Sequence, residues 1–168
     1  MSSGGAEPLA GGHYITFRLG DELFAINVVQ VREVLDLGPV TRVPTAPSFL
    51  RGVVNVRGKA IAVVNLRERF GLEPKADTAQ SRIVVLELDI DGEHCVVGGL
   101  ADSVHEVIEI EASQMEPPPS LASRWRSETV RGMVRRDQDF IQLLDASSVL
   151  SDELRDVVDA GPGGAVAG

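Results

Sequence analysis

Short stretches of alternating hydrophobic and polar residues dominate the chain, and most of them end at a turn signal. Ile15, Phe17 and Leu19 alternate with polar neighbours, which predicts a half-buried strand, and Gly20-Asp21 predicts the hairpin turn after it. Residues 27–30 fit either a short helical turn or the lead-in to the next strand. Further strands are expected at residues 22–26, 31–37, 52–56, 60–66, 83–88, 95–100, 104–110, 129–134 and 140–144.

Many short strands with closely spaced turns and one convincing helix predict an all-β protein, either a sandwich or a pair of small barrels. A polar stretch at residues 73–81 predicts a surface connection between two similar halves. Asp145 is placed to cap a closing helix with its apolar positions on one face. The expected organisation is a disordered tail at 1–12, one domain at 13–159 and a flexible tail at 160–168. Within the domain we expect the halves at about 13–72 and 81–144 and the closing helix at about 146–159.

The strand at 31–37 carries a charge in an unusual place. Alternation puts Val31, Glu33, Leu35 and Leu37 on one face, so Glu33 is a carboxylate among apolar neighbours. A buried and unpaired carboxylate would be costly. Two interpretations remain: the face is a partly exposed apolar groove with Glu33 at its edge, or Glu33 forms a local ion pair with an arginine.

A second conspicuous charge lies in the turn Arg57-Gly58. The strand after the turn, at 60–66, is almost continuously apolar, which is typical of a strand buried on both faces. The turn must then lie at a rim of the fold and carry Arg57 into solvent. A basic residue on a short rigid turn can be aimed at a partner, although it can also be an ordinary soluble turn residue.

Composition narrows the class of protein. The chain has 168 residues, of which 43% are hydrophobic, enough for one domain with a buried core. Its net charge of −9 argues against nucleic-acid binding, which needs a basic face. A single cysteine, Cys95, fits a reducing cytoplasm, and neither a secretion signal nor an apolar run of membrane-spanning length is evident. We therefore expect a cytoplasmic protein.

The sequence shows little sign of catalytic or metal-binding chemistry. Glu87-x-Asp89-x-Asp91-Gly92 half resembles a calcium loop, but Gly98 occupies the position that should supply the closing carboxylate. Cys95 and its neighbour His94 point to opposite faces of a strand and cannot act as a pair. Zinc-ligand spacing, a nucleophile elbow and phosphate-binding loops are missing from the sequence. We expect a binding module without metal, cofactor or enzymatic activity.

The longest informative motif covers residues 43–72, VPTAPSFLRGVVNVRGKAIAVVNLRERFGL. It resembles the central signature of CheW-type adaptor domains, and the resemblance extends from about Tyr14 to about Leu154. The resemblance implies two packed five-stranded SH3-like β-barrels and a non-enzymatic adaptor in bacterial chemotaxis signal transduction. Its implied partners are the regulatory domain of a CheA-type histidine kinase and the cytoplasmic signalling tip of a chemoreceptor, with membrane association only through receptors.

The resemblance also points to residues that couple the partners. In the family the receptor helix lies in an apolar groove between the barrels. The positions of this chain that match family coupling positions are Val31, Glu33, Gly52, Arg57 and Val107. The alternative is that the same interaction domain serves a different motility or developmental signalling complex.

Overall fold

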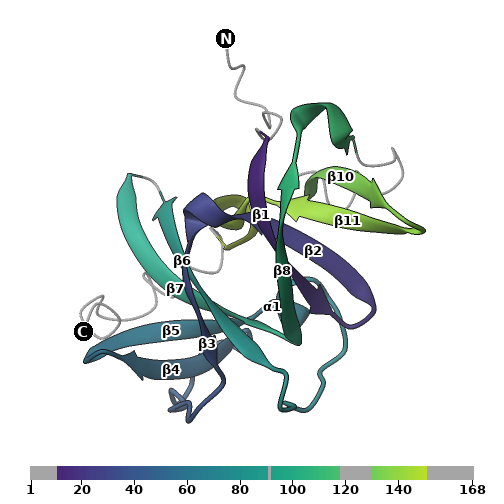
Figure 1. The fold of residues 1–168 in the computed structure, drawn as a ribbon. Helices are drawn as coiled ribbons and strands as arrows, with labels where there is room; N and C mark the ends of the chain where they lie inside the picture. Colours follow the sequence, from purple (N-terminus) through teal and green to yellow (C-terminus); the bar gives the residue numbers. More distant parts are fainter. Residues whose placement is uncertain (1–10, 91, 118–129, 151–168) are drawn as a thin grey trace.

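The protein folds into two curled β-sheets that pack against each other (Figure 1). The structure is a computed structural model, and it describes residues 11–90, 92–117 and 130–150. The predicted fold class, all-β with two packed SH3-like barrels, is confirmed. One sheet has five strands, as expected, whereas the other has six because a two-residue strand extends one edge.

The five-stranded sheet has the strand order β3-β6-β7-β5-β4. Its strands are β3 (Val31–Asp36), β4 (Leu50–Val56), β5 (Lys59–Asn65), β6 (Arg82–Ile90) and β7 (Glu93–Ala101). A short helix, α1 (Leu66–Arg69), follows β5. All neighbours are antiparallel except β5 and β7, which run parallel.

The six-stranded sheet has the order β8-β1-β2-β11-β10-β9 and is built from both ends of the described chain. Its strands are β1 (Gly12–Leu19), β2 (Glu22–Asn27), β8 (Ser103–Ile110), β9 (Met115–Glu116), β10 (Val130–Arg136) and β11 (Asp139–Leu144). Here the parallel pair is β2 with β11.

The predicted division of the chain into successive halves at 13–72 and 81–144 is wrong for the described strands. β1 and β2 pair with β8 and β11 rather than with β3, and β6 and β7 complete the sheet of β3–β5. Local alternation fixes which faces of a strand are apolar but not which distant strand it pairs with, so the halves could not be assigned from pattern alone. The five-stranded barrel is a continuous segment, β3 to β7, inserted between β2 and β8 of the other barrel.

Three apolar clusters fill this arrangement. One lies inside each barrel: Val63, Ile83 and Val85 are central in the five-stranded barrel, and Tyr14 and Ile141 in the six-stranded barrel. The third, which we call the inter-barrel cluster, joins buried residues of both sheets. It consists of Ile15, Phe17, Leu19, Phe24, Ile26, Val64, Leu66, Val84, Leu86, Leu88, Ile90, Val97, Ala101, Val130, Leu144, Ala146, Val149 and Leu150.

Strand β1 is therefore covered on both faces, and the prediction of a half-buried strand is wrong. Phe17 packs in the inter-barrel cluster while Tyr14 packs inside the six-stranded barrel. Thr16, expected on the solvent side, is 2% exposed, and its hydroxyl donates a hydrogen bond to the carbonyl oxygen of Glu106 at 2.8 Å. The hydrogen bond compensates the buried hydroxyl for the loss of water.

The ends of the domain agree in part with expectation. Gly12, placed in the disordered tail by sequence, begins β1 and pairs with Ile110. Residues 27–30 resolve as an Asn27-capped 3-10 turn over Val28–Gln30, named η1. Residues 146–150 are helical and Asp145 accepts a hydrogen bond from the Ser147 amide, as expected of an N-cap. The remainder of the predicted closing helix, residues 1–10 and the tail at 160–168 lie outside the described residues.

Candidate functional site

The β4–β5 hairpin presents Arg57 at its tip, as the sequence predicts. Arg57 and Gly58 have φ values of 52° and 84°, the left-handed pair of a tight turn that follows the twist of the strands. Asn55 braces the turn, because its side-chain oxygen accepts a hydrogen bond from the Gly58 amide at 2.8 Å. The arginine is therefore carried on a rigid support.

The guanidinium of Arg57 forms a forked ion pair with Glu33. Its two terminal nitrogens donate to the two carboxylate oxygens at 2.5 and 2.7 Å. The hydrogen bonds from Arg57 lower the pKa of Glu33, and the same bonds raise the pKa of Arg57. Of the two interpretations of Glu33, the local ion pair with an arginine is the one that the structure shows.

The ion pair connects two elements that are far apart in the five-stranded sheet. Glu33 lies on β3 and Arg57 on the β4–β5 turn, so the pair joins elements from the two opposite edges of the five-stranded sheet. The Arg57 side chain is 73% exposed and the Glu33 side chain 19%. Exposed ion pairs contribute little to stability, so the pair orients the arginine more than it holds the fold.

A β-bulge on β3 changes the expected face of Val31. Val31 pairs with Leu86 and Glu33 with Val85, which leaves one extra residue on β3. Val31 and Val34 consequently pack against the inter-barrel cluster, whereas Leu35 packs against the core of the five-stranded barrel. The prediction that Val31 shares a face with Leu35 is wrong, because a bulge breaks the period of two.

Gly52 is buried where another segment crosses β4. Thr41 forms an isolated bridge to Val53, with amide-to-carbonyl hydrogen bonds of 2.8 Å in both directions. A Cβ at Gly52 would lie 2.4 Å from the Thr41 carbonyl oxygen and 2.6 Å from Val40 Cγ1. Such contacts indicate that Gly52 has a structural role, because the absence of a side chain lets the segment at Val40 and Thr41 pack against β4.

The five predicted coupling residues thus occupy different settings. Glu33 and Arg57 are bound to each other, and Gly52 lies on the strand that leads to Arg57. Val31 is half-buried against the inter-barrel cluster. Val107 lies on β8, the edge strand of the other sheet, and is 52% exposed.

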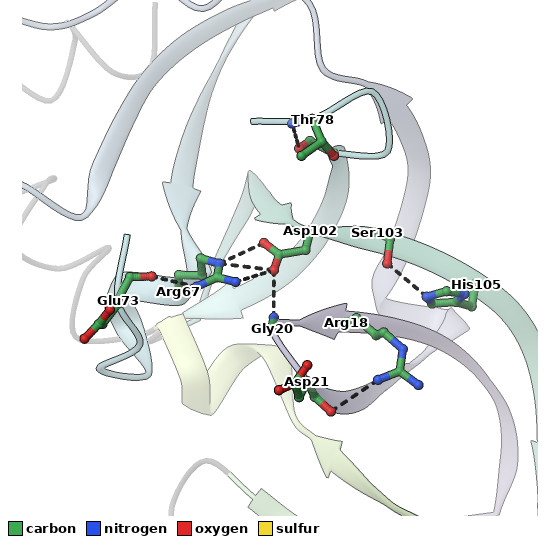
Figure 2. Close-up of polar contacts among 10 residues, drawn as sticks. Arg18, Gly20, Asp21, Arg67, Glu73, Thr78, Asp102, Ser103 and His105 are labelled. Carbon is green, nitrogen blue, oxygen red and sulfur yellow. Dashed lines mark hydrogen bonds and ion pairs between the residues drawn. The ribbon is translucent and has the colours of Figure 1, made fainter. Parts of the chain in front are cut away.

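Sequence reasoning missed a second charged pair, Arg67 with Asp102 (Figure 2). Arg67 Nε donates to Asp102 Oδ1 at 2.9 Å and its Nη2 to Oδ2 at 2.6 Å. Asp102 Oδ2 also accepts the Gly20 amide at 2.7 Å, and Arg67 Nη1 donates to the carbonyl of Glu73 at 2.6 Å. The pair ties α1 to the β1–β2 turn at the point where the chain passes from β7 to β8.

The environment of Asp102 favours its charged form. Burial alone raises the pKa of Asp102, but the hydrogen bonds from Arg67 and the Gly20 amide outweigh it, and the pKa lies below its ordinary value. The side chains of Arg67 and Asp102 are only 12% and 21% exposed. Because the partners are 35 residues apart in the sequence, no local spacing predicts the pair.

Glu87 of the candidate calcium loop and the thiol of Cys95 both contact other residues of the fold. Glu87 of the calcium-like stretch is bound to Arg32, with a distance of 2.6 Å from Arg32 Nε, and Asp91 lies outside the described residues. Cys95 packs at the border of the inter-barrel cluster, and burial, followed by the charges of Glu93 and Asp89, raises the pKa of its thiol. Across the described ranges, no helix has the length and hydropathy to cross a membrane.

Comparison with known proteins points to the CheW-like family. The family model described as a CheW-like domain matches residues 13–154. A probable chemotaxis protein CheW of Rhizobium etli is 30% identical over 82% of this chain and 86% of its own length. The chemotaxis protein CheW of Rhizobium meliloti is 31% identical over 87% of this chain and 92% of its own. The crystal structure of the scaffolding protein TtCheW from Thermoanaerobacter tengcongensis superposes with a TM-score of 0.70 at 32% identity, covering 80% of this chain and 89% of that chain.

Proposed function

The chain belongs to the CheW-like family, and we propose that it is a non-enzymatic adaptor that couples chemoreceptor signalling tips to a CheA-type histidine kinase. The matched relatives are named as chemotaxis proteins, and the solved neighbour is named as a scaffolding protein. In this proposal the protein works in the cytoplasm, and any membrane association comes through the receptors.

The observation that carries the proposal is the exposed Arg57 of the Glu33–Arg57 ion pair. Its guanidinium is fixed by Glu33 on one side and 73% of its side chain is exposed, so it remains open to a partner's carboxylate or carbonyl groups. Partly buried apolar side chains border the same barrel core, among them Leu35, Leu37 and Val56. Apolar contact with an oriented charge at its edge suits the binding of an amphipathic helix, since the charge fixes the register.

The binding test uses the full chain and two probes, a soluble chemoreceptor fragment that contains the signalling tip and the isolated kinase regulatory domain. Calorimetry should show saturable binding of each. Arg57→Glu should weaken receptor-tip binding by about tenfold or more, because it loses the oriented cation and places a carboxylate beside Glu33. Its circular dichroism and thermal midpoint should stay close to those of the unmodified protein, because the pair is exposed.

Lys59→Glu serves as the matched control. Lys59 is exposed on the same hairpin, and its reversal changes the net charge by the same amount. It should change receptor-tip binding by less than about twofold. Equal losses in the two variants would contradict a specific role for Arg57, and an unfolded Arg57→Glu protein would show that Arg57 is structural.

A second candidate function is favoured by one match. A protein named FrzA from Myxococcus xanthus is 30% identical over 139 residues of this chain. The same interaction domain is therefore also found under a name other than CheW, which supports the alternative of another motility or developmental complex. Failure of the unmodified protein to bind either probe would favour that alternative.

A further inference from the structure

The two barrels contain an internal repeat whose units differ from the two similar halves that the sequence predicts. Residues 31–37, VREVLDL, correspond to residues 104–110, VHEVIEI, and residues 50–56, LRGVVNV, correspond to residues 130–136, VRGMVRR. The structure supports the correspondence, because the strand orders β3-β6-β7-β5-β4 and β8-β1-β2-β11-β10 place the matching segments at the same positions in the two sheets. The parallel pair falls at the same place in each, β5 with β7 and β2 with β11.

A bulge occurs at the equivalent place in both edge strands. On β3 the pairing with β6 shifts between Val31 and Glu33. On β8 Val104 pairs with Phe17 but Val107 with Ile15, so two residues of β8 lie opposite the single residue Thr16 of β1. The buried Thr16 hydroxyl bonds to the Glu106 carbonyl beside this shift. Bulges re-aim side chains, and here each one redirects a glutamate, Glu33 or Glu106.

Each redirected glutamate meets an arginine from the opposite side of its barrel. Arg136, at the end of β10, donates to Glu106 at 2.8 Å, as Arg57 does to Glu33. β8 forms one edge of the six-stranded sheet. β10 lies next to the opposite edge, which is formed by the two-residue strand β9. We call each such pair a clasp: a glutamate at the bulge of an edge strand joined to an arginine of the hairpin across the barrel, which is Arg57 in the β4–β5 turn or Arg136 at the end of β10. The two glutamates occupy equivalent positions of the repeat, whereas the two arginines do not: Arg136 corresponds to Val56, and Arg57 corresponds to the turn residue Asp137.

The valine that follows the glutamate is packed in one barrel and exposed in the other. Val34 packs against the inter-barrel cluster, whereas its equivalent Val107 is 52% exposed. The clasp of the six-stranded barrel therefore holds an edge strand whose apolar side chain stays open to solvent.

We propose that Glu106 and Arg136 are positioning residues that fix the edge strand β8 so that Val107 is presented to the receptor tip. The proposal rests on the proposed adaptor function and adds a second clasp to that of Glu33 and Arg57. The side chains of Arg136 and Glu106 are 44% and 61% exposed, so we expect substitution of either residue to leave the fold intact.

Four full-length variants test the clasp: Arg136→Glu, Glu106→Arg, the charge-swapped double variant, and Arg135→Glu as control. Arg135 is the adjacent residue, is also exposed, and pairs with Glu116 on β9 instead of with β8. The single clasp variants should bind the receptor-tip fragment about tenfold more weakly at unchanged thermal midpoint, and the swapped variant should recover to within about threefold. Arg135→Glu should stay within about twofold of the unmodified protein.

Combination with Val107→Asp separates positioning from direct contact. If the clasp acts through Val107, adding Arg136→Glu to Val107→Asp should cause little further loss. Additive losses, no recovery in the swapped variant, or equal losses in Arg135→Glu would each overturn the proposal.

Hydrogen exchange of the β8 amides is a readout that needs no partner. Exchange should accelerate in the single clasp variants and return toward normal in the swapped variant. If the unmodified protein binds no receptor fragment, the adaptor function fails, yet this exchange pattern still shows the clasp. Unchanged exchange in both single variants would overturn the clasp itself, whatever the binding result.

Discussion

Replacement of Gly52 by alanine is the sharpest test of how this fold is held together. The added Cβ would lie 2.4 Å from the Thr41 carbonyl oxygen and 3.0 Å from its carbonyl carbon, and both are backbone atoms that cannot rotate away. Gly52 also has a φ of 151°, a conformation that L side chains rarely adopt. The variant must either move the crossing segment off β4 or keep the close contacts, and the strained φ remains in both cases.

Both routes have a calculable cost. Moving the crossing segment breaks the two hydrogen bonds between Thr41 and Val53, each worth about 1 kcal/mol, and leaves the unusual φ of residue 52, which costs about 1–3 kcal/mol more. Keeping the backbone conformation costs about 1–3 kcal/mol, and overpacking costs about as much again. We expect a destabilisation of about 3–5 kcal/mol, which lowers the thermal midpoint of a domain of this size by roughly 10 °C.

The repeat supplies a matched control, Gly132→Ala. A Cβ at Gly132 would meet the Glu116 carbonyl oxygen at 3.5 Å and Leu143 Cδ1 at 3.8 Å, which are ordinary contacts. This variant should change the free energy of unfolding by less than about 1 kcal/mol.

Urea and thermal unfolding of the full chain, followed by circular dichroism, compare the two variants. A Gly52→Ala protein as stable as the unmodified one would refute the reasoning. A stable variant that fails to bind the receptor tip would instead restore Gly52 as a contact residue.

Two further predictions concern ionisable groups. Asp102→Asn should destabilise the protein by about 1–3 kcal/mol at pH 7, because Arg67 loses its charged acceptor. Since the folded-state pKa of Asp102 is lowered, its contribution is present above the unfolded pKa of about 3.9 and is lost as pH falls through the folded value. Urea unfolding at pH 7 and pH 3 should therefore show a difference that narrows at pH 3; a constant difference would contradict this account. Iodoacetamide should alkylate Cys95 more slowly than a free cysteine at pH 8, because the pKa of its thiol is raised, and Cys95→Ser should leave partner binding unchanged. Rapid alkylation or lost binding would show that Cys95 has a chemical role.

Features encoded by neighbouring residues were predictable. The turns at Gly20-Asp21 and Arg57-Gly58 and the cap at Asp145 each depend on a few adjacent residues, and all three lie where the sequence predicts them. The all-β class follows from the same local signals. The fold family followed from a long motif, not from any single residue.

Features that depend on distant pairing were not predictable. The parallel pairs β5–β7 and β2–β11 decide which strands share a barrel, and no alternation pattern specifies them. The bulge on β3 moved Val31 to the other face, and coverage of β1 on both sides buried Thr16. Glu33 and Arg57 were recognised as conspicuous charges, but that they bind each other required the curvature of the sheet.

The insertion of one barrel into the other has a consequence for the order in which the chain folds. All strands of the five-stranded barrel lie within residues 31–101, so they can pair as soon as that segment leaves the ribosome. The six-stranded barrel must instead join β2 to β11, whose partners Leu23 and Ile141 are separated by most of the domain. A preformed five-stranded barrel would shorten that loop by holding the end of β2 close to the start of β8, which lowers the entropy cost of closing the second barrel. We expect nascent chains released after β7 to contain one folded barrel whose amides are protected from hydrogen exchange. In these chains β1 and β2 would not yet be paired with β8 and β11.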